Sequence, residues 1–154
     1  MGLPPNLRLI TNVGPPGSLQ KFPPLSQGEK AVLRIVLPLP PKELNPNIAR
    51  RTHWAVKGRK VGRYRAEADF LTQDAIREQG PRGIPWKAAT VRVTFYFRDR
   101  RRRDRDNLLA SLKAGFDGIA DAGVVVNDSE FTYRPVVVEV DAKNPRVLVV
   151  IEET

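Results

Sequence analysis

Two aspartates in a basic stretch of this 154-residue chain are the residues whose types and spacing could do chemistry. Asp104 and Asp106 are two positions apart, so in extended backbone both side chains would point to the same side. Carboxylate oxygens at that spacing suit Mg²⁺ or Mn²⁺, hard cations that also bind phosphate oxygens. The alternative is helix capping, since an aspartate that precedes a helix accepts hydrogen bonds from its free N–H groups. Capping accounts for one aspartate more readily than for two.

A helix that we expect over residues 106–122 would place more polar side chains beside this pair. At roughly 100° per residue, Lys113 and Asp117 each fall about 20° from Asp106 around the helix. The alternative is a Lys–Asp surface pair, which contributes about a few tenths of a kcal/mol. The apolar stripe of the helix lies elsewhere and consists of Leu108, Leu112, Phe116 and Ile119.

A third candidate carboxylate follows this helix after a short apolar segment. Asp128 stands in the sequence Asn127-Asp128-Ser129. These residue types are equally typical of an ordinary turn, so both interpretations stay open.

Arginines surround the aspartate pair. Because like charges this dense repel one another, a phosphate clamp is favoured over a solvated loop, and the planar guanidinium matches phosphate oxygens. A second group of cations lies mostly off the apolar stripe of an earlier helix. The candidate DNA-binding residues are Arg98, Arg100, Arg101, Arg102, Arg103, Arg105, Lys57, Arg59, Lys60 and Arg63.

The composition narrows the function classes. Twenty-six Lys and Arg against 17 Asp and Glu give a net charge of +9, which favours a nucleic acid partner first and an anionic membrane surface second. No cysteine and a single histidine, His53, exclude thiol catalysis, disulfides and cysteine-ligated or multi-histidine metal sites. No apolar run is long enough to span a membrane, and the N-terminus has no signal-peptide pattern.

The patterning predicts an α+β fold in the order β-α-β-α-β-β, with two helices packed on a mixed sheet. Pro135 falls in the third strand and indicates an edge or bulged strand, and Asn144-Pro145 marks the turn that follows it. Residues 1–28 are rich in Pro and Gly and predict a flexible arm, which leaves residues 29–154 as one domain. We expect strands over 31–37, 91–97, 131–140 and 146–152, and helices over 56–79 and 106–122.

The ordered set of motifs resembles the RusA-type Holliday-junction resolvases of bacteria and their phages. Its centre is the run Arg-Arg-Arg-Asp-Arg-Asp-Asn-Leu at 101–108, followed by Lys-Ala-Gly-Phe-Asp at 113–117. Ala122-Gly123 and Asp128 complete it, and the resemblance covers residues 31–153. Further matches lie at 37–41, at 45–47 and at His53-Trp54-Ala55.

The resemblance implies a RusA-like fold and a homodimeric, Mg²⁺-dependent endonuclease. Its metal-binding and catalytic carboxylates would be Asp104, Asp106 and Asp128, with Lys113 as the essential lysine and Asp117 in a less certain role. Two departures stand out. The segment before Lys113 is longer than in the best-known member, and Asn127 stands where the family often has a second aspartate.

We therefore expect paired phosphodiester hydrolysis at four-way DNA junctions during recombination and repair. Two symmetric cuts require two copies of the site and hence a homodimer. The expected location is the cytoplasm of a bacterium or phage-infected host. The alternatives are a nuclease for other branched DNA in phage replication or packaging, a non-catalytic nucleic-acid-binding module and, on charge alone, a ribosome-like component.

Overall fold

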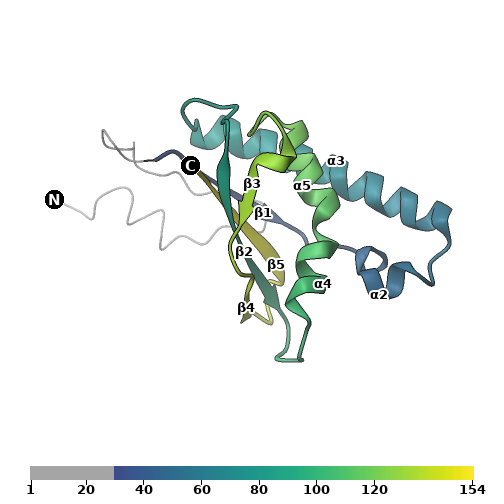
Figure 1. The fold of residues 1–154 in the computed structure, drawn as a ribbon. Helices are drawn as coiled ribbons and strands as arrows, with labels where there is room; N and C mark the ends of the chain where they lie inside the picture. Colours follow the sequence, from purple (N-terminus) through teal and green to yellow (C-terminus); the bar gives the residue numbers. More distant parts are fainter. Residues whose placement is uncertain (1–29) are drawn as a thin grey trace.

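A computed structural model describes residues 30–154 as an α+β fold, in which a five-stranded mixed sheet is covered by helices (Figure 1). The fold class predicted from the sequence is therefore confirmed. The predicted arm at residues 1–28 lies outside the described residues. Within the described part, no helix combines the length and the apolarity that crossing a membrane requires.

The sheet is built around its two longest strands, β2 (Ala89–Phe97) and β5 (Arg146–Glu153), which pair antiparallel. β1 (Val32–Leu37) pairs antiparallel with the other edge of β5. β3 (Phe131–Tyr133) and β4 (Val137–Val140) both pair parallel with the free edge of β2. Since β2 separates β4 from β5, these two strands are not neighbours, although the expected turn between them is present at Asn144.

The core lies on one face of this sheet. Val91, Val93 and Phe95 are buried, while Arg92 between them is exposed, as the alternation in the sequence predicts. Across the antiparallel pair, Phe95 stands opposite Val147 and Val93 opposite Val149, so buried residues from adjacent strands meet directly.

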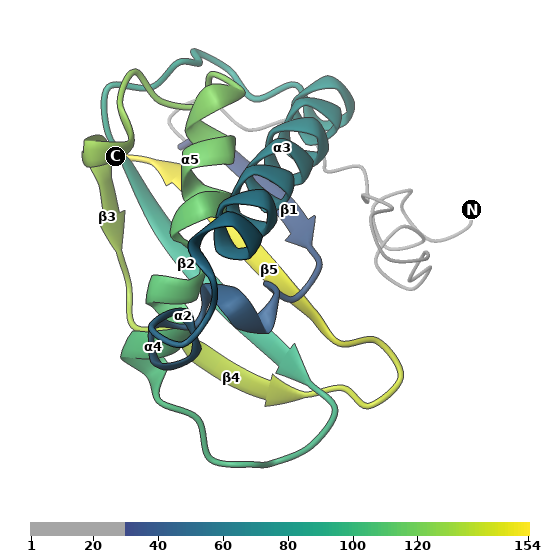
Figure 2. The same ribbon diagram turned by 90° about the vertical axis from the view of Figure 1, so that its right-hand side faces the viewer.

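The helices cover the buried face of the sheet. The long α3 (Trp54–Gln79) crosses α5 (Lys113–Asp121) in front of the strands (Figure 2). Gly118 permits this crossing, because a Cβ there would collide with the carbonyl oxygen of Arg65 and lie 2.9 Å from the Cβ of Ala68. The shorter elements are η1 (Lys42–Leu44), α2 (Pro46–Ala49), α4 (Arg105–Ser111) and η2 (Asp128–Glu130).

The single helix predicted over 106–122 is wrong in one respect, because α4 ends at Ser111 and α5 begins at Lys113. Leu112 between them has φ −92° and ψ 0°. The Ser111 hydroxyl donates a 2.6 Å hydrogen bond to the carbonyl of Leu108, and a serine that bonds back to the preceding turn bends a helix. The four residues of the predicted apolar stripe are nevertheless all buried.

The single strand predicted over 131–140 is also wrong, because it is divided into β3 and β4. Pro135 has no N–H to donate, so the ladder with β2 is interrupted around it. Arg134 still donates to the carbonyl of Val91 at 2.9 Å, which holds the linking residues against the sheet. β3 and β4 form the outer edge of the sheet, and the predicted edge position is confirmed.

Candidate functional site

The position of Asp128 is set by the residues that precede it. Gly123 ends α5 with φ 93°, a conformation that glycine adopts without strain. The next residues pair with Trp86, whose N–H donates to Val124 O at 2.8 Å and whose carbonyl accepts from Val126 N at 3.1 Å. The Asn127 side chain then caps η2 by accepting from Ser129 N at 3.2 Å. These bonds place Asp128 beside the start of α5.

Lys113 lies between two carboxylates that come from different elements. Its Nζ is 3.1 Å from Asp117 Oδ1, one turn along α5, and 3.6 Å from Asp128 Oδ2 in η2. The pKa of Lys113 is raised, mainly because Asp117 accepts its hydrogen bond, with the negative charges of Asp117 and Asp128 adding to the effect. The ammonium group is therefore protonated at neutral pH. Three of the five predicted site residues meet here, and we call them the Lys113 cluster.

The other two predicted site residues lie at the start of α4. Asp104 is the N-cap, and its Oδ1 accepts from Asp106 N at 2.9 Å and from Asn107 N at 3.3 Å. Asp106 lies in the first turn and is exposed. Within the described chain, no hydrogen bond or ion pair joins Asp104 or Asp106 to the Lys113 cluster. The capping role predicted as an alternative is thus present for Asp104.

Carboxylate oxygens are suitable ligands for a hard divalent cation, but the described residues do not bring enough of them together to form a ready-made site. Both capping bonds of Asp104 end on Oδ1, so Oδ2 has no hydrogen-bond partner among the described residues. Asp117 and Asp128 already converge on one cation, the Lys113 ammonium. Mg²⁺ is commonly held by only one or two carboxylates together with water and phosphate oxygens. No group of three or more His, Cys, Asp or Glu residues that could hold a metal occurs in residues 30–154.

Two further residues next to the cluster were not identified from the sequence. Arg65 on α3 forms a bidentate ion pair with Asp121, in which Nε and Nη2 donate to the two carboxylate oxygens at 2.6 and 2.9 Å. Burial raises the pKa of Tyr133 to about 12, and the charges of Asp128 and then Asp117 add to the rise. The ring of Tyr133 also packs on Phe116, 4.8 Å between centroids. No local pattern marks either residue, because each reaches the cluster through the folding of a distant element.

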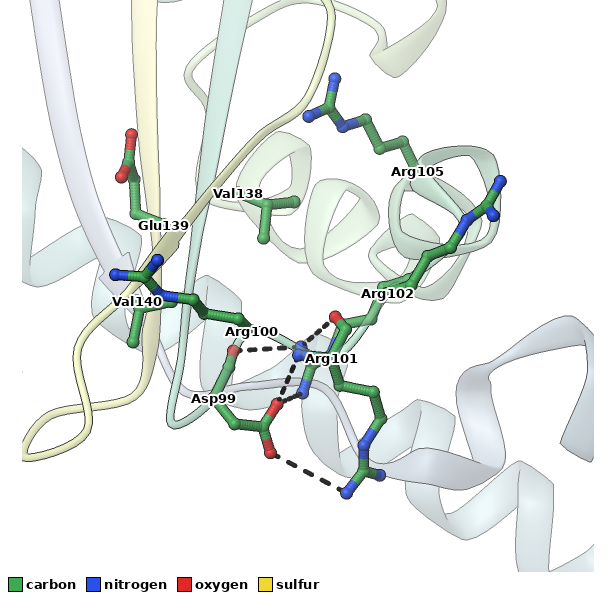
Figure 3. A pocket seen from close by; sticks show the side chains of 9 residues that line it. Asp99, Arg100, Arg101, Arg102, Arg105, Val138, Glu139 and Val140 are labelled. Atoms are coloured by element: carbon green, nitrogen blue, oxygen red, sulfur yellow. Dashed lines mark hydrogen bonds and ion pairs between the residues drawn. The ribbon is translucent and has the colours of Figure 1, made fainter.

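The arginine loop after β2 divides into structural and free side chains (Figure 3). Asp99 accepts from Arg101 N at 3.0 Å and from the guanidinium of Arg103 at 2.9 Å. Arg103 also stacks on Phe97, 3.7 Å from the ring centroid. These contacts fix the shape of the loop. A cleft between the loop and β4 is lined by residues 99–103 together with Arg105, Val138, Glu139 and Val140.

The remaining predicted DNA-binding cations have no ion-pair partner in the part of the chain that the structure describes, and all but Lys60 are exposed. They are Arg98, Arg100 and Arg102 in the loop and Arg105 at the start of α4. On the first turns of α3, Lys57, Arg59 and Arg63 are exposed and Lys60 is half-buried. Cations without an ion-pair partner are available to bind phosphates. Their role in DNA binding stays a prediction.

Comparison with known proteins identifies a relative of this chain but no family of known activity. No protein-family model matches this chain. A protein of Xylella fastidiosa (strain Temecula1 / ATCC 700964), described as an uncharacterized protein, is 32% identical over 113 residues, which cover 71% of this chain and 69% of the relative. That description names no activity, so the resemblance to RusA-type resolvases stays a prediction. The chain belongs to the same family as this Xylella fastidiosa protein.

Proposed function

We propose that this protein is a Mg²⁺-dependent endonuclease that cuts branched DNA, with four-way junctions as the preferred substrate. The observation that supports this best is the meeting of Asp128 from η2 with Lys113 and Asp117 from α5. Carboxylates and a lysine from separate elements are brought together where no structural need for them is evident. The ordered motifs that resemble RusA-type resolvases support the same proposal.

In this proposal, Asp104, Asp106 and Asp128 would hold the metal, although the described residues do not group them as a ready-made metal site. Asp117 would orient Lys113. Bound Mg²⁺ would activate water and neutralise charge on the phosphate under attack. The protonated Lys113 would donate to a phosphoryl oxygen, and positioned donors of this kind typically contribute about 2.7–4 kcal/mol to transition-state stabilisation. Asp128, which is paired with Lys113 in this structure, would be available to the metal if the ammonium turned to the phosphate.

The cations around the site would bind the flanking DNA. Arg100 and Arg102 extend from a loop whose shape is fixed by Asp99, and Arg105 extends from the start of α4 (Figure 3). α2 packs against α4, and the basic first turns of α3 follow α2 in the chain. Contacts to phosphates fix the position and register of DNA without reading its sequence. Recognition would therefore depend on DNA shape, and paired cuts would require two copies of the chain.

A second candidate function is a non-catalytic DNA-binding module. The N-cap role of Asp104 favours it, because a capping aspartate needs no metal to explain it. In that case the Lys113 cluster would be a surface ion-pair network of small energetic value.

The test compares cleavage of a synthetic four-way junction, a flap, a linear duplex and a single strand, each with Mg²⁺ and with EDTA. The proposal expects Mg²⁺-dependent paired nicks in the junction and slower or no cutting of the linear forms. Faster cutting of the flap would favour a nuclease for other branched DNA. Binding of all four without any cleavage would favour the non-catalytic module and contradict the proposal.

A further inference from the structure

Trp54 is the most exposed large apolar side chain in the described part of the protein. It is the first residue of α3 and 80% exposed, whereas the other tryptophan, Trp86, is 1% exposed. Tryptophan is highly buried on average because of its large apolar surface. An exposed one that contributes nothing to the core therefore needs another explanation.

The orientation of Trp54 is fixed by its neighbour. His53 is the N-cap of α3, and its Nδ1 accepts a 3.2 Å hydrogen bond from Ala55 N. The imidazole stacks on the indole of Trp54, with 5.6 Å between the ring centroids and 28° between the planes. An aromatic face held in this way loses little side-chain entropy when a planar ligand stacks on it.

The segment of the chain that contains Trp54 carries positive charges and no negative ones. From Asn45 to Ala66 the sequence contains no carboxylate. Of the cations in this segment, Arg65 alone makes a salt bridge within the described chain. The amino-terminal half of α3, which carries Trp54, extends away from the sheet (Figure 1). The seven cations of the segment are Arg50, Arg51, Lys57, Arg59, Lys60, Arg63 and Arg65.

We propose that Trp54 is a stacking platform for an unpaired base of single-stranded or branched DNA, whose phosphates are bound by Arg50, Arg51 and Lys57. An aromatic face between cations is the arrangement that binds single strands without reading their sequence, since every base has a π-face. This inference rests on the proposed function only in taking DNA as the ligand, and it requires no catalysis. At a junction, the platform would hold a base that becomes unstacked where the arms meet.

A second copy of the chain is the other occupant that an exposed tryptophan could have. The charges argue against it, because a symmetric contact through Trp54 would bring two clusters of unpaired cations together. The centres of protein interfaces are depleted in charged residues. A polyanion removes this repulsion, and a second copy increases it.

The test uses the intrinsic fluorescence of the full chain in EDTA, so that no cleavage occurs. Oligothymidine, a blunt duplex and inorganic polyphosphate are titrated separately. Oligothymidine should quench the Trp54 emission, while polyphosphate, which has charge but no bases, should bind with little quenching. The buried Trp86 serves as the internal reference, and a Trp54→Phe variant identifies the signal of Trp54.

Trp54→Ala should weaken oligothymidine binding about 5- to 100-fold and leave polyphosphate binding unchanged. Phe70→Ala is the matched control, since Phe70 is 64% exposed on the same helix but lies near Glu67 and Asp69. It should bind oligothymidine like the parent. Equal quenching by polyphosphate, or unchanged oligothymidine binding by Trp54→Ala, would overturn the platform. A blue-shifted emission that depends on protein concentration without DNA, together with a dimer that Trp54→Ala abolishes, would overturn it in favour of an interface between copies.

The two proposals fail separately. If the parent cuts junctions while Trp54→Ala binds normally, the nuclease stands and the platform falls. If oligothymidine quenches Trp54 but no substrate is cut with Mg²⁺, the platform stands and the nuclease falls.

Discussion

Asp128 Oδ2 lies 3.6 Å from Lys113 Nζ, although a helix, a glycine turn and a buried segment separate the two residues along the chain. Both side chains are substantially exposed, so the ion pair itself adds little to stability. The contact instead holds an acidic and a basic group together, at the end of the segment 124–126 that pairs with Trp86. The consequences of that arrangement can be measured.

Asp104→Asn separates the observed capping role of this residue from its proposed metal-binding role. Asparagine caps helices about as well as aspartate, so the free energy of unfolding should change little. Loss of the charge should abolish Mg²⁺-dependent junction cleavage while junction binding stays intact or becomes stronger. Asp104→Ala should lose cleavage and also about 1 kcal/mol of stability, measured by urea unfolding. If Asp104→Asn cuts like the parent, capping is the whole role of Asp104.

Removing the charge of Asp128 should lower the pKa of Tyr133 from about 12 toward its ordinary value of 10.0. A nearby negative charge disfavours the tyrosinate anion, so its loss favours ionisation. Burial is the main cause of the raised pKa, so part of the rise should remain in Asp128→Asn. Tyrosinate absorbance during an alkaline titration in metal-free buffer measures this. Asp74→Asn, distant on α3, is the control and should leave the titration unchanged.

Gly118→Ala should destabilise the protein by about 1–3 kcal/mol or prevent folding, because the new methyl group would collide with the Arg65 carbonyl. Gly62→Ala is the matched control on α3, where nothing lies within 4 Å of the added Cβ. That substitution should stabilise the protein by about 0.5–1 kcal/mol, since alanine favours helix more than glycine does. Urea unfolding of both variants measures the difference. Equal stabilities would contradict the close crossing of α3 and α5.

Asp121 should contribute to stability only above acidic pH. Its pKa lies below the ordinary 3.8 because Arg65 donates two hydrogen bonds to it. A carboxyl with a lowered folded-state pKa stabilises the fold fully above its unfolded pKa, and the contribution is lost as pH falls through the folded value. The melting temperature of the parent should therefore drop below about pH 3.8. Asp121→Asn should show a smaller drop, and parallel curves would contradict the role of the ion pair.

The sequence patterns predicted those parts of the fold that depend on local periodicity. The alternation through Val91, Val93 and Phe95 and the stripe from Leu108 to Ile119 each report which face is buried, and both were confirmed. The break at Leu112 was missed because it arises from a serine hydroxyl bonding to the preceding turn. Periodicity alone does not reveal such a bond.

The sequence predicted the residues of the candidate site but not which of them lie close together, because those contacts depend on long-range pairing. Asn127 and Gly123 are local turn signals, but the contact of Asp128 with Lys113 depends on the pairing of residues 124–126 with Trp86, far away in the sequence. Tyr133 on β3 and Arg65 on α3 lie near enough to feel the charges of Asp117 and Asp128, and no short motif encodes those approaches. The resemblance to RusA-type resolvases identified the acidic residues as candidates, and the fold determines that Asp117 and Asp128 lie beside Lys113.

The salt dependence of junction affinity tests whether the arginine loop binds DNA phosphates. Binding of a four-way junction should weaken steeply between about 50 and 200 mM salt, because phosphate contacts release counterions. Replacing Arg100 and Arg102 by alanine should lower the slope of log affinity against log salt by about one for each side chain lost. Lys143→Ala, on the turn before β5, should leave the slope unchanged. A flat dependence for the parent would contradict the clamp.

The most direct measurement of the central claim is single-turnover cleavage of a four-way junction in Mg²⁺ by Asp128→Asn and by Glu130→Gln. Both substitutions remove one negative charge from η2, and of these two residues Asp128 alone forms an ion pair with Lys113 within the described chain. We expect Asp128→Asn to cut at least about 100-fold more slowly and Glu130→Gln to cut like the parent. Cleavage by Asp128→Asn at the parental rate would contradict the account.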